Sequence, residues 1–65
     1  MNAELPDNWI DEAVAHVTAR LNAMSDIEVI LEYVKVFDRS PSPFGTVNEI
    51  RERIVSHVRQ VLTAQ

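Results

Sequence analysis

The sequence predicts an all-α protein: a small three-helix bundle, or a helical hairpin with an extra helix, that dimerises through its central helix. Three observations favour this fold class. Apolar residues recur at helical spacing in three stretches, two of these stretches follow a four-residue N-cap signature, and nearly all the helix breakers are gathered in one connector. We expect helices over residues 7–23, 26–38 and 47–63, in a single domain that covers residues 1–65.

The first helix is predicted from apolar residues whose spacing alternates between four and three. They are Ile10, Val14, Val17, Leu21 and Met24, and they resemble a coiled-coil seam. Pro6 and Asp7 come just before them. A proline suits the first turn of a helix because its missing N–H is no loss there, and Asp7 can cap the helix or complement its dipole. We therefore expect the first helix to begin at these two residues.

The second and third helices are predicted from capping boxes. Ser25 is followed three residues later by Glu28, and Thr46 is followed in the same way by Glu49. In this motif the hydroxyl and the carboxylate each accept a hydrogen bond from a backbone N–H that the helix leaves unpaired. The buried stripe that we expect on the third helix is Val47, Ile50, Ile54, Val58 and Val61.

The connector between the second and third helices contains two of the three prolines and the only glycine of the chain. A residue that precedes proline avoids helical geometry, so Ser40 and Ser42 are expected to end the second helix. Gly45 adds backbone freedom just before the third helix. Phe44 is expected to pack over the end of the bundle; alternatively, it is an exposed anchor for a partner.

A strand is the alternative for the second helix, because residues 27–37 are rich in β-branched side chains. Their apolar positions do not alternate cleanly, and a capping box precedes them. These two features favour the helix.

Composition limits the kinds of function that the chain can have. The 65 residues include no cysteine, which excludes disulfides and cysteine-ligated metals. The net charge of −4 argues against a general attraction to nucleic acid or to anionic membranes. The N-terminus lacks the basic start and apolar run of a secretory signal, so we expect a cytoplasmic protein without a membrane span.

The second helix has two apolar faces. One comprises Ile27, Ile30, Val34 and Phe37, and the other comprises Val29, Tyr33 and Val36. A single neighbouring helix can cover only one of them. The second face is therefore covered either by another helix of the same chain or by a second copy or another protein. The residues that we predict at a partner or dimer interface are Trp9, Val29, Tyr33, Val36, Phe37 and Phe44.

Candidate catalytic chemistry is sparse. His16 and His57 lie on different predicted helices, without the spacing of a metal site. The chain has no nucleophile motif, and its one glycine cannot form a phosphate-binding loop. We therefore predict no catalytic, cofactor-binding or metal-binding residues.

These observations favour a small non-enzymatic protein–protein interaction module: an adaptor, inhibitor or regulator that uses an apolar helical surface rimmed by acidic residues. The second apolar face predicts a homodimer. The alternative is a dimeric DNA-binding transcriptional regulator that uses Arg51, Arg53 and Arg59 of the third helix.

Overall fold

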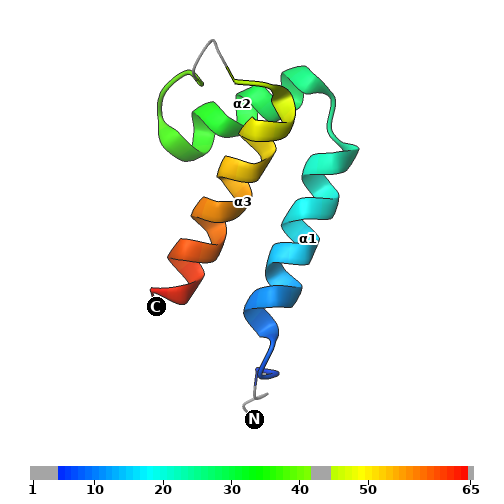
Figure 1. Cartoon of the computed structure of the whole chain (residues 1–65), viewed down its shortest axis with the longest axis vertical. Coiled ribbons are helices and arrows are strands. Elements are labelled where there is room, and N and C mark those ends of the chain that lie inside the picture. The colour runs from blue at the N-terminus through cyan, green and yellow to red at the C-terminus, as the bar shows by residue number, and fades with distance from the viewer. Residues whose placement is uncertain (1–4, 42–44, 65) are drawn as a thin grey trace.

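The computed structural model describes residues 5–41 and 45–64. It contains three helices, α1 (Trp9–Ala23), α2 (Asp26–Phe37) and α3 (Val47–Thr63) (Figure 1). The prediction of a small all-α bundle is confirmed, and the strand alternative for residues 27–37 is excluded.

The three helices form an elongated molecule of 46 × 23 × 17 Å. α1 and α3 run side by side in opposite directions, and α2 lies against one end of α3 (Figure 1). α3 is the central helix, because it contacts both α1 and α2. α2 is therefore the middle helix in chain order but not in the packing.

The core lies where the end of α1, the inner face of α2 and the first half of α3 meet. Its buried side chains are Leu21, Val29, Tyr33, Ile50 and Ile54. Val14, which is nearer the start of α1, is also buried. Val61, which we expected on the buried stripe of α3, is 44% exposed, because α2 covers α3 only near the other end (Figure 1).

α1 begins later than predicted. The N–H of Trp9 donates to the carbonyl of Pro6 at 3.0 Å, which closes a turn before the helix. Asn8 occupies the N-cap position without a side-chain hydrogen bond. Pro6 and Asp7 therefore belong to this turn, and neither lies in the first turn of α1.

The capping box predicted at Ser25 forms in full, and of the box predicted at Thr46 the hydroxyl half forms. Ser25 Oγ accepts from the N–H of Glu28 at 3.3 Å, and Glu28 Oε1 accepts from the N–H of Ser25 at 3.2 Å, which completes the box at the start of α2. At the start of α3, Thr46 Oγ1 accepts from the N–H of Glu49 at 3.1 Å. Helix α3 begins at the predicted residue because this local chemistry ends the connector there.

α2 ends at Phe37, before the prolines of the connector, and Asp38 is its C-cap. Asp38 adopts the left-handed conformation, with φ 56° and ψ 36°, and its N–H donates to the carbonyl of Val34 at 2.8 Å. Asp and Asn tolerate this conformation better than most residues other than glycine. The chain therefore leaves the helix at Asp38, before it reaches Pro41. Phe44, for which we predicted a role at the end of the bundle, lies outside the described residues.

The cap at Thr46 gives a first test. Replacing Thr46 with Ala removes the acceptor for the Glu49 N–H, and we expect a loss of about 1 kcal/mol in the free energy of unfolding. Thr46→Ser keeps the oxygen and is the matched control, with a much smaller loss. Denaturant unfolding measures both. Equal losses would show that the methyl group matters and the hydroxyl does not.

Candidate interaction surface

The predicted interface residues lie in different environments. Val29 is 0% exposed and Tyr33 is 2% exposed, so both belong to the core of the single chain. We predicted these two residues at a partner or dimer interface, and in the single chain they pack against Leu21, Ile50 and Ile54 instead. Trp9 and Val36 are half-buried.

Phe37 is also half-buried, and it joins an aromatic row between α2 and α3. Its ring centroid lies 4.4 Å from that of Tyr33 and 4.8 Å from that of His57. These spacings are typical of packed aromatic pairs. Phe37 and His57 therefore help to hold α2 on α3, and Phe37 presents only part of its surface to solvent.

The exposed apolar residues of α2 lie on its other side. Ile27 is 70% exposed, Leu31 is 62% exposed and Val34 is 37% exposed. Their spacing of four and three places them in one row, which we call the α2 stripe. At 100° per residue, this row lies about 150° around the helix from Val29 and Tyr33. It therefore points away from the core.

Charged side chains border the α2 stripe on one flank. Glu28 and Lys35 are both exposed, and seven residues of helix place them almost directly above one another. Lys35 Nζ lies 3.9 Å from Glu32 Oε2 within the same helix. The border of this apolar surface therefore has both signs of charge, where we predicted an acidic rim.

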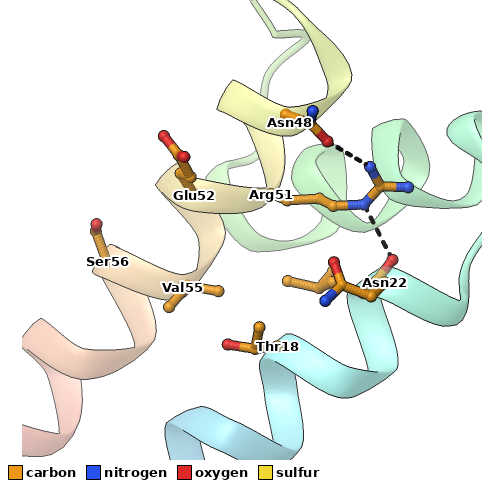
Figure 2. A pocket seen from close by; sticks show the side chains of 8 residues that line it. Thr18, Asn22, Asn48, Arg51, Glu52, Val55 and Ser56 are labelled. Carbon is orange, nitrogen blue, oxygen red and sulfur yellow. Dashed lines mark hydrogen bonds between the residues drawn. The ribbon is translucent and has the colours of Figure 1, made fainter.

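A groove of about 470 Å³ between α1 and α3 is the second candidate binding site (Figure 2). Its lining residues are Thr18, Leu21, Asn22, Asn48, Arg51, Glu52, Val55 and Ser56. Arg51 is its cation, and the side chain extends from α3 toward the end of α1 (Figure 2).

The guanidinium of Arg51 is engaged in bonds that hold the fold. Its Nε donates to the carbonyl of Leu21 at 3.1 Å, and its Nη2 donates to the carbonyl of Met24 at 3.3 Å. Its Nη1 donates to Asn48 Oδ1 at 3.0 Å. A helix leaves its last carbonyls without partners inside the helix, and a cation there also complements the dipole. Arg51 thus caps the end of α1 from α3.

The same guanidinium lies near the start of α2. Its Nη2 is 4.0 Å from Asp26 Oδ1, and the Arg51 side chain is 19% exposed. One side chain of α3 therefore contacts both sides of the junction between α1 and α2. This role could not be predicted from the sequence, because the groups that Arg51 contacts are mostly backbone carbonyls of residues distant along the chain.

The other two arginines of the DNA-binding alternative point elsewhere. Arg59 Nη1 donates to Asp11 Oδ1 at 2.9 Å and so ties the far end of α3 to the start of α1. Arg53 is exposed and lies about 200° around α3 from Arg51. The three arginines do not form one cationic face, and two of them are paired with other parts of the chain.

The two histidines are also far from forming a joint site. His16 is exposed on the outer side of α1, and His57 packs against Phe37. Among residues 5–41 and 45–64, no group of three or more histidine or acidic side chains is placed to hold a metal ion. Within the same part of the chain, none of the helices has the length and apolar character needed to cross a membrane.

Comparisons with protein-family models, with curated proteins and with solved structures find no match to this chain. Of the two features described above, the α2 stripe is the one that is not already occupied by contacts within the fold.

Arg51 provides a second test. We expect Arg51→Ala to lower the free energy of unfolding by about 2 kcal/mol, because it leaves partly buried carbonyls of Leu21 and Met24 without a charged donor. Arg53→Ala, on the exposed side of the same helix, is the matched control and should change the free energy by less than about 0.5 kcal/mol. Denaturant unfolding compares them. Equal effects would contradict the capping role of Arg51.

Proposed function

We propose that this chain is a small non-enzymatic protein–protein interaction module, an adaptor, inhibitor or regulator, whose binding surface is the α2 stripe. One observation carries the proposal: Ile27, Leu31 and Val34 form an exposed apolar row on a helix whose opposite face is already in the core. The helix therefore has apolar surface left after the chain has folded.

The spacing of these three residues favours a binding surface over exposure by chance. Single exposed apolar residues are common on protein surfaces. Anchors at positions i, i+4 and i+7 instead match the way a helix presents one face to an apolar groove or to another helix. Ile27 and Val34 span about 10 Å along the axis, which is two turns of helix.

The free energy of burying these side chains and their helix propensities also favour a binding surface. Burying a large aliphatic side chain contributes about 1.5–3 kcal/mol relative to leaving it in water. Isoleucine and valine are also weaker helix formers than the alanine or lysine that an exposed position would favour. Three such residues facing water contribute little to the isolated fold, whereas a partner that covers them gains several kcal/mol.

The chemistry of the stripe supports binding over catalysis. The side chains of Ile27, Leu31 and Val34 contain no group that transfers a proton, attacks a carbonyl or ligates a metal. Such a surface recognises a partner by shape and by exclusion of water. The expected partner surface is therefore apolar, with charges placed to meet Glu28 and Lys35 at the border.

A photo-crosslinking amino acid tests this function in the cells from which the chain comes. Placed at position 31, in the middle of the α2 stripe, it should form covalent protein adducts. Placed at position 19, where Ala19 is exposed on α1, it is the matched control and should form few. We expect adduct yields to differ by at least about tenfold, because a bound partner holds the probe against its target.

The mass of the adduct identifies the class of partner. A mass of twice the chain indicates a second copy, and any other discrete mass indicates a different protein. Either result supports an interaction surface at the α2 stripe. Equal yields at positions 31 and 19, or no adduct at position 31, would overturn the proposal.

A further inference from the structure

We infer that the partner of the α2 stripe is the α2 stripe of a second copy, packed antiparallel about a two-fold axis that passes beside Leu31. This inference rests on the proposed function, since it names the occupant of the same surface. The antiparallel arrangement of the two helices follows from the charges that border the stripe.

The charges favour self-pairing in one direction. Glu28 lies three residues before Leu31, Lys35 lies four residues after it, and both are on the same flank of the stripe. In an antiparallel pair centred beside Leu31, the Glu28 of each copy stands at the level of Lys35 of the other. The symmetry makes two such pairs. In a parallel pair the two-fold axis would place the Glu28 and Lys35 flanks of the two copies on opposite sides of the contact, where neither charge meets an opposite charge of the other copy.

Lys35 is free to make this contact. Its side chain is 79% exposed, and its interaction with Glu32 is at 3.9 Å, near the outer limit for an ion pair. Glu28 uses one carboxylate oxygen, Oε1, to cap the start of α2. Its other oxygen can accept from a lysine of the second copy, so the capping box and the inter-chain pair are compatible.

The apolar residues fit the same register. When Glu28 is level with Lys35 of the second copy, Leu31 is within one residue of the level of its own equivalent. Ile27 comes within two residues, or about 3 Å along the axis, of Val34 of the second copy. The larger side chain of each stripe therefore lies beside the smaller one, an arrangement that lets facing helices interdigitate.

The position of α2 leaves room for a second copy. α2 lies at one end of the molecule against α3 (Figure 1). The side chains of the stripe are exposed, whereas Val29 and Tyr33 on the opposite face pack in the core. On the flank opposite Glu28, the half-buried Ile30 extends the apolar surface. A contact made mainly by one short helix is smaller than the 1,200–2,000 Å² of typical stable interfaces, so we expect dissociation in about the micromolar range.

Engineered cysteines test both the pairing and its direction, because the chain has no cysteine of its own. In the antiparallel pair, a mixture of Ile27→Cys and Val34→Cys chains should form a disulfide between the two variants. Ile27→Cys alone should not, because the two copies of residue 27 are about 13 Å apart along the axis and a disulfide joins Cα atoms about 4.4–6.8 Å apart. Leu31→Cys alone should link to itself.

Ala19→Cys, exposed on α1, is the matched control for random collisions. We expect the mixed pair and Leu31→Cys to cross-link at least tenfold faster than Ala19→Cys under mild oxidation. Self-linking of Ile27→Cys without linking of the mixture would overturn the antiparallel arrangement.

Light scattering coupled to gel filtration provides a second readout that needs no cysteine. The wild-type mass should rise from one chain to two with concentration, Leu31→Glu should stay at one chain, and Ala19→Glu should behave as wild type. A wild-type chain that stays monomeric to several hundred micromolar, with no cysteine pair above the control, overturns the inference. The proposed function then still holds if the crosslinker at position 31 captures a different protein, and fails if it captures none.

Discussion

α3 packs against both other helices and so determines where each of them lies. α1 and α2 make few contacts with each other, so each is held mainly through α3. Ile50 and Ile54 supply the apolar part of that contact, and Arg51, next to Ile50, supplies the polar part. A chain of 65 residues without a disulfide has few other sources of stability, because it buries a smaller fraction of its surface than a larger domain does. Arg51 donates hydrogen bonds to the last carbonyls of α1 beside the buried side chain of Leu21, so the polar contact and the apolar core meet at this point.

This packing explains why apolar surface remains on α2. The helix packs one face against α3, and no further helix of the described chain covers the opposite face, where Ile27 and Leu31 are the most exposed large apolar residues of α2. A larger domain would add another element there. In this chain the uncovered side is the surface for which binding is proposed, and its bordering charges, Glu28 and Lys35, suit a second copy of the same helix. The fold and the proposed function therefore have one origin, which is a short helix with two apolar faces and one neighbour to cover them.

The sequence predicted the number of helices well because the helix boundaries depend on local chemistry. The hydroxyls of Ser25 and Thr46 bond to backbone groups only three residues away, so their effect is visible in a short stretch. Local chemistry does not predict which face of α2 is buried. Both of its faces have helical periodicity, and the choice depends on how α3 crosses the helix, which is a property of the whole fold. The role of Arg51 was hidden for the same reason, because Leu21 lies thirty residues away from it.

The orientation of α2 determines which of its methyl groups solvent can reach, so the exposure of those methyl groups tests it. A soluble paramagnetic chelate broadens the NMR signals of methyl groups that solvent can reach. In dilute solution the account predicts strong broadening for Ile27 and Leu31, and protection for Val29 and Ile54. At high concentration, Ile27 and Leu31 should become protected while Val29 and Ile54 stay unchanged. Strong broadening of Val29 together with protection of Leu31 in dilute solution would contradict the account, because it would mean that α2 packs on α3 through its other face.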